Sequence, residues 1–429
     1  MAAGMAAPAR RQVVVSGIGA VSGFGWGVEP LWAGLRAGAT AIRPFVRFDS
    51  SQHRTRLAAE VPAAPPTPGA TPAGLAAGRS RLSFADRFAV AAAAEALAGA
   101  GLGETLGGEA DERSAPAAGA AGVFFGSSTG GMWESENYLA GVWAGGRPPL
   151  RLLAAQQVNC PGDAVARRFG VTGPVSTISS ACASGALAIG AALAAVRSGE
   201  VEVALTGGAD SLCQLTYAGF NALRSVDEAP CRPFREGRGG LSLGEGAAVL
   251  VLEPLARVLA RGAEPLAVLL GAGAACDAHH MTAPEPAGRG AAAALAAALA
   301  DAGLEAAEID FVNAHGTGTP LNDVAEWHAL ERVFGARARC LPVAATKAGV
   351  GHLLGSAGAI EALVTVLSLQ RGELHPVPFA AVPVDAACPV ALVAGAPLPL
   401  AGARAAASIS LAFGGSNAAL VFARWGAAA

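Results

Sequence analysis

Cys182 stands in a run of small residues whose composition suits a nucleophile. The sequence around it, positions 179–185, reads S-S-A-C-A-S-G and leads into a predicted small-residue helix ending near Arg197. The N-terminus of a helix lowers a thiol pKa through its dipole and free N–H groups. Small neighbours let the backbone turn sharply and let a substrate carbonyl approach. We therefore expect a reactive thiol at Cys182.

Five of the other cysteines are expected to be inert. The chain has seven cysteines and no C-x-x-C pair, which favours reduced thiols. None of the following is predicted to open a small-residue helix: Cys160, Cys213, Cys231, Cys340 and Cys388.

Two histidines lie in glycine-rich turns. His315 follows an apolar run in N-A-H-G-T-G-T (313–319), and His352 ends K-A-G-V-G-H (347–352). Loops that follow strands concentrate functional residues, so we expect these two histidines to act in a site. A structural role is expected for His53, His328 and His375. Metal binding is not expected, because neither H-x-x-x-H nor H-E-x-x-H is present and no carboxylates surround His315.

Two further features would support chemistry at such a site. Lys347 and Glu361 lie on either side of His352 in the sequence, which favours an ion pair between them. The turn at 412–417, A-F-G-G-S-N, is expected to place an amide N–H beside that of Cys182 and so form an oxyanion hole. The alternative, a phosphate-binding loop, lacks the G-x-x-x-x-G-K-[ST] pattern.

The elements that position these residues follow an α/β pattern. Short apolar runs such as 123–125, 203–205 and 311–312 alternate with alanine-rich helices. Three pairs of segments recur in the same order: 91–131 with 291–318, 179–197 with 346–370, and 241–252 with 409–422, the last pair read as hairpins. Two similar halves, 1–260 and 261–429, explain this order better than shared composition alone.

Composition excludes several classes of function. The 429 residues are 52% hydrophobic, enough for a large core, and the net charge of −3 gives no basic excess for nucleic acid. The first residues lack a secretory h-region, and runs such as 291–300 are shorter than the ~20 residues of a membrane span. A cytoplasmic protein without membrane insertion is expected.

Four motifs make the chain resemble a known family. S-A-C-A-S-G at Cys182, N-A-H-G-T-G-T-P at His315, T-K-A-G-V-G-H-L-L-G-S-A-G at Lys347 and F-G-G-S-N at Phe413 are similar to those of elongating β-ketoacyl-acyl carrier protein synthases. The likeness is to synthase II and to type II polyketide ketosynthases. It implies a thiolase-like fold with two pseudo-repeated halves in five layers (αβαβα).

The resemblance also implies residue roles in a decarboxylative Claisen condensation. Cys182 would be acylated, His315 and His352 would promote malonyl decarboxylation, and Lys347 and Glu361 would organise that pocket. The backbone N–H groups of Cys182 and Phe413 would form the oxyanion hole. Further substrate-binding positions implied are Thr317 and Thr319 for the phosphopantetheine arm, Phe413 as a gate, Phe220 and Thr129 in the acyl pocket, and Asp277 and His280 in a mobile loop. Thr129 replaces a bulkier aliphatic residue, and Leu411-Ala412 replaces the usual Phe-Gly.

The implied partner is acyl carrier protein, which delivers substrates on its phosphopantetheine arm without a separate cofactor. Because that protein is acidic, a basic docking face is expected, with candidates Arg79, Arg81, Arg87 and Arg224. The family normally forms homodimers, and a heterodimer with a ketosynthase-like subunit is the alternative.

Three other assignments compete with this one. A chain-length-factor-like subunit would usually lack the cysteine, a thiolase would carry a second cysteine near its C-terminus, and an initiating synthase would replace one histidine by asparagine. The sequence does not choose between fatty acid and polyketide or polyene pathways, and it does not define the acyl chain length.

Overall fold

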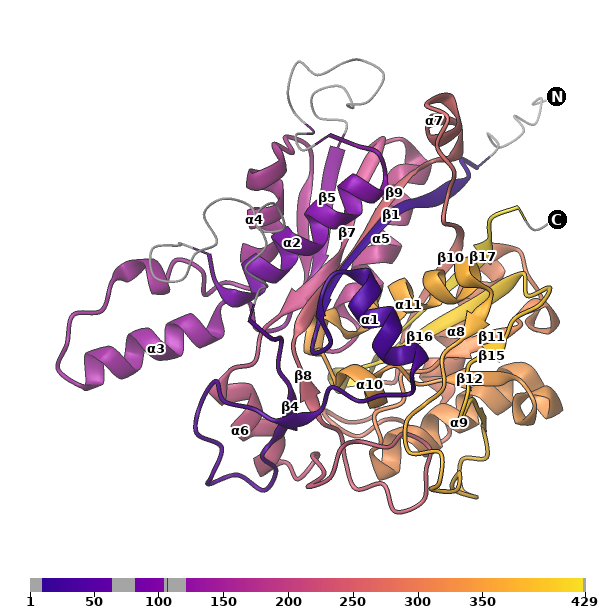
Figure 1. Cartoon of the computed structure of the whole chain (residues 1–429). Coiled ribbons are helices and arrows are strands. Elements are labelled where there is room, and N and C mark those ends of the chain that lie inside the picture. Colours follow the sequence, from indigo (N-terminus) through magenta and orange to yellow (C-terminus); the bar gives the residue numbers. More distant parts are fainter. Residues whose placement is uncertain (1–9, 64–81, 104–105, 107–120, 427–429) are drawn as a thin grey trace.

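The computed structural model of the chain (Figure 1) describes residues 10–63, 82–103, 106 and 121–426. Two of the predicted docking residues, Arg79 and Arg81, lie outside the described residues. Most of the Pro/Ala-rich segment 61–77 does as well.

The strands of the main sheet are arranged in the same order on both sides of a central pair. β1 (Val13–Ser22) pairs antiparallel with β10 (Ala267–Cys276) through Val14 and Val15 only. On the β1 side the order is β1, β9 (Gly246–Pro254), β7 (Val203–Asp210), β5 (Ala121–Gly126), β6 (Val175–Ile178). On the β10 side it is β10, β17 (Ser416–Arg424), β16 (Ala405–Leu411), β11 (Phe311–Asn313), β12 (Pro342–Ala344), β14 (Ala391–Leu392).

Helices cover and separate these two groups of strands, giving five layers. The outer layer on the β1 side holds α2 (Phe84–Gly99) and α4 (Cys160–Phe169). The middle layer holds α5 (Ser184–Ser198) and α11 (Ala357–Arg371), which contact each other and strands of both groups. The outer layer on the β10 side holds α8 (Arg289–Ala302) and α9 (Pro320–Phe334). The chain passes from one group to the other at α7 (Leu255–Ala260), beside the proposed division at residue 260.

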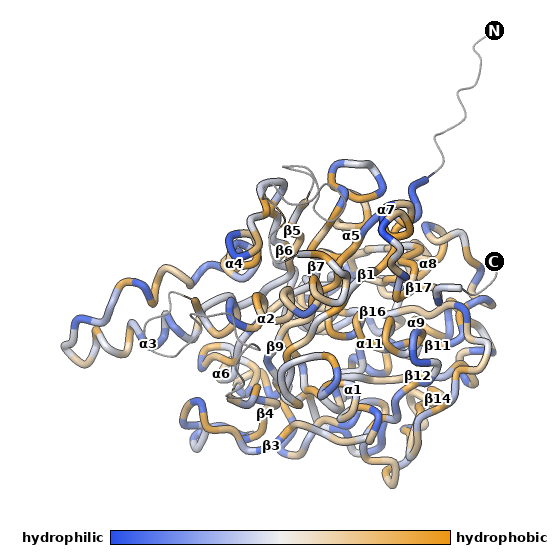
Figure 2. The backbone as a smooth tube through the Cα atoms, turned by 45° about the horizontal axis from the view of Figure 1, so that its top comes forward, coloured by the Kyte–Doolittle hydropathy of each residue, from blue (hydrophilic) through white to orange (hydrophobic). Residues whose placement is uncertain are grey.

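The remaining elements lie mostly around the sheet ends. The helices are α1 (Val28–Arg36), α3 (Met132–Trp143), α6 (Gln214–Ala222) and α10 (Lys347–Val350). The short strands are β2 (Gly25–Trp26), β3 (Arg43–Pro44), β4 (Leu57–Ala59), β8 (Leu243–Gly244), β13 (Glu373–Leu374) and β15 (Leu398–Pro399). Hydrophobic residues run along the inner strands in Figure 2, whereas hydrophilic ones mark the outer turns.

Alanine-rich helices and strand glycines are explained by close packing. A Cβ added at Gly17 or Gly19 of β1 would lie 2.0 Å from a carbonyl oxygen of α2. The same arrangement recurs in the other half, where Gly271 and Gly273 of β10 lie against α8. Small residues on both elements let the helix axis approach the sheet closely. An alanine-rich helix packed on a strand that carries glycines thus recurs in both halves.

Gly19→Ala is expected to destabilise the protein by about 2–3 kcal/mol, because the new methyl group overlaps the α2 backbone. Thermal or urea unfolding measures the change. Gly99→Ala is the matched control, since none of the described residues lies within 4 Å of its added Cβ and alanine favours a helix by up to about 1 kcal/mol. Equal stability of the two variants would contradict this packing.

One predicted element is wrong. Residues 409–422 form a hairpin, because β16 pairs antiparallel with β17. Residues 241–252 do not form one, because β8 pairs with β4, whereas β9 pairs with β1 and β7. The two segments have similar local patterns, and the long connection from β7 to β9 decides the pairing.

Among the described helices, the window 181–198 is long and apolar enough to cross a membrane. However, 61% of this window is buried inside the fold. Its helix, α5, packs between the two groups of strands. It is therefore the core helix of a globule.

Candidate active site

Parallel strands from both halves deliver the predicted residues to one place. β5, β6 and β7 run parallel, as do β11, β12 and β16. Cys182 follows the carboxyl end of β6, His315 follows β11, Lys347 follows β12 and Phe413 follows β16. Ligand sites in α/β sheets lie beyond the carboxyl ends of such strands. The topology thus assembles the site from both halves.

Cys182 occupies a sharp turn between β6 and α5. The preceding Ala181 has a φ of 45°, in the left-handed region. Ser128 Oγ donates to the Ala181 carbonyl at 3.1 Å and Ser184 Oγ donates to it at 2.6 Å. The cysteine itself is 7% exposed. The turn therefore presents the sulfur at the end of the strand, as a nucleophile elbow does.

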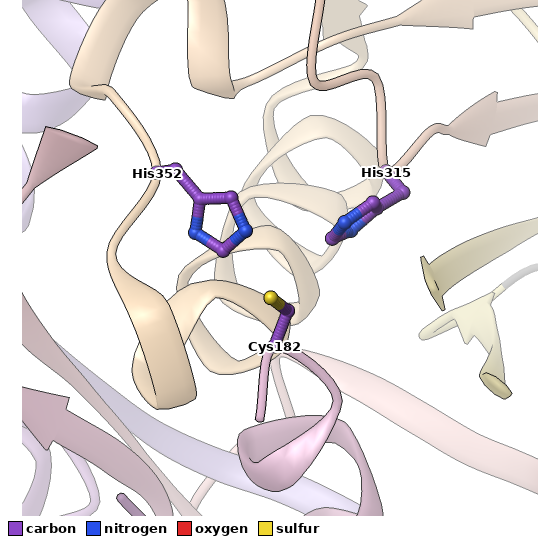
Figure 3. A group of neighbouring side chains, drawn as sticks. All are labelled: Cys182, His315 and His352. Carbon is purple, nitrogen blue, oxygen red and sulfur yellow. The ribbon is translucent and has the colours of Figure 1, made fainter. Parts of the chain in front are cut away.

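The sulfur and the two imidazoles face one another (Figure 3). One donor atom each from Cys182, His315 and His352 lies within 4.8 Å of the other two. The two histidine rings are nearly perpendicular, at 86°, with centroids 5.6 Å apart. The three residues that were predicted to act in a site thus lie together in the structure, and their catalytic roles stay predictions.

The neighbours of the imidazoles fix their tautomers. Lys347 Nζ lies 2.9 Å from His315 Nδ1, and an ammonium can only donate, so Nδ1 accepts. The N–H of Leu354 donates to His352 Nδ1 at 3.0 Å. A neutral imidazole that accepts at Nδ1 carries its proton on Nε2. Both histidines therefore offer an Nε2–H donor and neither offers a free lone pair.

Both imidazoles are neutral at physiological pH. Burial lowers the pKa of His315 well below 6.5, and the Lys347 ammonium and His352 lower it further. Burial and Lys347 likewise lower the pKa of His352 well below 6.5. The site thus holds two uncharged N–H donors beside a thiol.

Cys182, His315 and His352 also have the donor atoms of a metal site. Metal-bound histidines usually donate their second ring N–H to a carbonyl or carboxylate. Here both Nδ1 atoms accept, one of them from a cation. These surroundings oppose a metal, and the expectation that none is bound stays a prediction.

The predicted ion pair is present. Lys347 Nζ forms an ion pair with Glu361 and also donates to the His315 carbonyl at 2.5 Å. Burial raises the pKa of Glu361 to about 7, although Lys347 acts in the opposite direction. Because both side chains are buried, the pair fixes the lysine against His315.

The pKa of the nucleophile differs from expectation. Burial raises the pKa of the Cys182 thiol to about 11, although Lys347 and the backbone N–H of Phe413 lower it. The prediction that its place before α5 lowers the pKa is therefore wrong for the resting protein. The thiol is therefore protonated at neutral pH.

Alkylation of Cys182 by iodoacetamide is expected to accelerate about tenfold per pH unit between pH 7 and 9, because only the thiolate reacts and the pKa is near 11. Peptide mass spectrometry follows the rate at each pH. Alkylation of the exposed Cys276 and Cys340, measured in the same samples, serves as the control for the activity of the reagent at each pH. A plateau below pH 8 at Cys182 would mean that the thiolate is already stabilised.

A cavity of about 360 Å³ opens onto the three residues. Six residues from the predicted substrate-binding and docking sets line it: Phe220, Arg224, Asp277, Thr317, Thr319 and Phe413. Leu411 and Ala412, which precede the predicted gate Phe413, line it as well. The Phe220 and Phe413 rings lie 5.6 Å apart, centroid to centroid. Thr317 Oγ1 and Thr319 Oγ1 lie 2.9 Å apart. The backbone N–H of Phe413 faces the Cys182 sulfur.

Three predicted residues are not brought to this cavity. The Thr129 hydroxyl donates to Asp210 at 2.9 Å. His280 is exposed, and its Nδ1 accepts from two backbone N–H groups of its own loop. Arg87 is half-buried over the Phe84 ring and donates to the Ser83 carbonyl. Their roles in substrate or partner binding stay predictions.

Two carboxylates were missed. Glu326 accepts from the N–H groups of His315 and Gly316 at 2.6 and 2.8 Å, and Asp323 accepts from that of Gly318 at 3.1 Å. Burial raises the pKa of Glu326 to about 8. Both lie on α9, directly after the His315 turn. This pair of acidic residues, spaced i and i+3, was the feature of the sequence that could have indicated their role.

Comparison with known proteins agrees with this geometry. "Beta-ketoacyl synthase, N-terminal domain" matches residues 10–257, and "Beta-ketoacyl synthase, C-terminal domain" matches 266–379. The chain belongs to the beta-ketoacyl synthase family. It is therefore an acyltransferase of the condensing type with a thiolase-like α/β fold, as its motifs predicted.

Individual relatives span nearly the whole chain. The 3-oxoacyl-[acyl-carrier-protein] synthase 2 of Staphylococcus aureus (strain COL) is 34% identical, over 96% of this chain and 98% of that protein. A structure of the ishigamide ketosynthase/chain length factor superposes with a TM-score of 0.87 at 35% identity, covering 97% of this chain and 100% of that one. A type II polyketide ketosynthase in complex with its acyl-carrier protein gives 0.82 at 25% identity, covering 96% and 99%.

Proposed function

We propose that this chain condenses an acyl group held on Cys182 with a malonyl group held on acyl carrier protein. The observation that carries the proposal is the convergence of the Cys182 sulfur and two neutral imidazoles, both protonated on Nε2, on one cavity. A thiol can hold an acyl group, and two N–H donors can stabilise an enolate oxygen.

Acyl transfer comes first. Cys182 attacks the thioester carbonyl, and the backbone N–H groups of Cys182 and Phe413 stabilise the oxyanion. The carrier thiol leaves and takes up the proton that Cys182 loses. No histidine lone pair is required, which suits the tautomers of His315 and His352.

Condensation follows in the same cavity. The carboxylate of the malonyl thioester leaves as CO2, and its bonding electrons move to the thioester oxygen. The Nε2–H groups of His315 and His352 stabilise this enolate. Its carbon then attacks the acyl carbonyl and a carbon–carbon bond forms. The Cys182 sulfur leaves as a thiolate and takes a proton from solvent water.

The substrate arm enters beside Thr317 and Thr319, whose hydroxyl groups line the cavity. Arg224 is exposed at the same cavity, and its charge suits an acidic carrier protein. No separate cofactor is needed, since the carrier's phosphopantetheine holds both substrates. The protein is proposed to work in the cytoplasm.

A dimer is the proposed assembly. β6 is the last strand of the sheet order, and Val175 at its start is 41% exposed. On α3 the large residues Leu139, Val142 and Trp143 are exposed. A heterodimer is the alternative to a homodimer, because the similar ishigamide structure is a ketosynthase/chain length factor. The complete set of Cys182, His315 and His352 argues against a non-catalytic partner subunit.

Mass spectrometry of the full chain with acyl and malonyl carrier proteins tests the proposal. Addition of the acyl mass to Cys182, followed by a β-ketoacyl carrier product, supports it. Varying the acyl chain length then distinguishes fatty acid from polyketide substrates. An unmodified Cys182 with every acyl donor, alone and with candidate ketosynthase-like subunits, would reject it.

A further inference from the structure

A buried carboxylate lies beneath the site without a counter-ion. Asp210 ends β7 and is 0% exposed. Its Oδ1 accepts from Ser127 Oγ at 2.7 Å, and from the Thr129 N–H and hydroxyl at 2.8 and 2.9 Å. Its Oδ2 accepts from the Gly355 N–H at 2.6 Å and the Ser128 N–H at 3.0 Å. In the part of the chain that the structure describes, no cation pairs with it.

Asp210 Oδ2 is connected to His352 through backbone hydrogen bonds of the loop 352–355. The backbone of Leu354, which donates to His352 Nδ1, is directly followed by Gly355, which donates to Asp210. Leu354 has a φ of 53°, and a Cβ at Gly355 would lie 2.7 Å from Asp210 Oδ2. The loop 352–355, which contains His352, therefore packs closely against the Asp210 carboxylate.

Asp210 is also connected to the turn that holds Cys182, through Ser128. Ser128, whose N–H donates to Asp210, uses its hydroxyl to hold the carbonyl of Ala181 at 3.1 Å. Ala181 is the strained residue directly before the nucleophile. The same carboxylate thus contacts two loops, one holding the nucleophile turn and one holding the imidazole.

We infer that Asp210 is a positioning residue that sets the spacing between the Cys182 turn and the His352 loop. The inference rests on the proposed function, in which the enolate held by His352 must reach the acyl carbonyl on Cys182. Burial raises the pKa of Asp210, whereas its N–H and hydroxyl donors lower it. Two carboxylate oxygens can accept from both loops, and a side-chain amide cannot.

Asp210→Asn tests the histidine side. Four donors surround Oδ1, because the Ser128 N–H reaches it at 3.1 Å as well as Oδ2. The amide nitrogen is therefore expected to take the place of Oδ2 and to face the Gly355 N–H, while Ser128 keeps its bond to Oδ1. Displacing the His352 loop should slow CO2 release from malonyl carrier protein by about 10²-fold, because misplacement by about 1 Å has that effect. Acylation of Cys182 should change by less than about threefold, since its backbone donors keep their places.

Ser128→Ala tests the connection to the Cys182 turn, because it removes only the hydrogen bond from the Ser128 hydroxyl to the Ala181 carbonyl. We expect slower acylation of Cys182, by about tenfold, and a changed rate of its alkylation by iodoacetamide, with CO2 release unaffected. Thr206→Val is the matched control. Its buried hydroxyl lies on β7, the strand that ends at Asp210, and has no hydrogen-bond partner among the described residues, so both steps should stay at wild-type rates.

The opposite selectivities of the two variants are the expected result, because a general loss of stability would slow both steps together. Parallel loss of both steps in Asp210→Asn, or wild-type rates in either variant, overturns the inference. If Asp210→Asn does not fold, Ser128→Ala decides alone. A wild-type protein that forms no product rejects the proposed function instead, and the alkylation rates then still test the Cys182 side.

Discussion

Cys182→Ala is expected to reduce formation of the β-ketoacyl product by at least about 10³-fold, because Cys182 is the one thiol among the described residues that line the cavity. CO2 release from malonyl carrier protein should stay within about tenfold of wild type, since both Nε2–H donors remain in place. Product is measured by mass spectrometry and CO2 by a coupled assay. This separation of the two steps follows from the tautomers, which assign the histidines to the enolate and not to the thiol.

Cys213→Ala is the matched control for that experiment. Cys213 is buried, lies at the start of α6, and its thiol pKa is raised to about 11 by burial, as for Cys182. Its removal should leave both steps within about threefold of wild type, because Cys213 contacts Thr216 and is not among the described residues that line the cavity. Residual condensation in Cys182→Ala at the wild-type rate would show that the acyl group is held elsewhere.

These two cysteines also show what local sequence can predict. Cys160 begins α4 and Cys213 precedes α6, so a helix start does not by itself identify the nucleophile. What distinguishes Cys182 is the pair of imidazoles contributed by the other half of the chain. The motifs around His315 and His352 indicated that pair, and the repeated pattern of helices and strands predicted the α/β fold.

The remaining features depend on tertiary burial and long-range contacts. A thiol pKa near 11 results from the whole fold closing over Cys182, which the small residues at 179–185 do not reveal. Asp210 accepts from backbone N–H groups of two distant segments, so no local pattern points to its partners. The error at 241–252 has the same origin, since strand pairing there is decided by β7.

Lys347→Met is expected to lower both stability and the rate of CO2 release. It leaves the buried Glu361 without its cation, which typically destabilises a protein by about 3–5 kcal/mol. It also frees His315 Nδ1, so the ring can take either tautomer and its Nε2–H is no longer fixed. Decarboxylation should fall by about 10²-fold or more, within the range of general acid–base effects. Urea unfolding and CO2 release measure the two losses.

The double variant Lys347→Met/Glu361→Gln separates these two losses. Without either charge, no unpaired buried ion remains, and stability should return to within about 2 kcal/mol of wild type. The rate of CO2 release should stay as low as in Lys347→Met, since His315 Nδ1 still lacks its donor. Recovery of both properties together would mean that the lysine acts only through stability. Recovery of stability alone would identify the ammonium as the group that holds His315 in its donating tautomer.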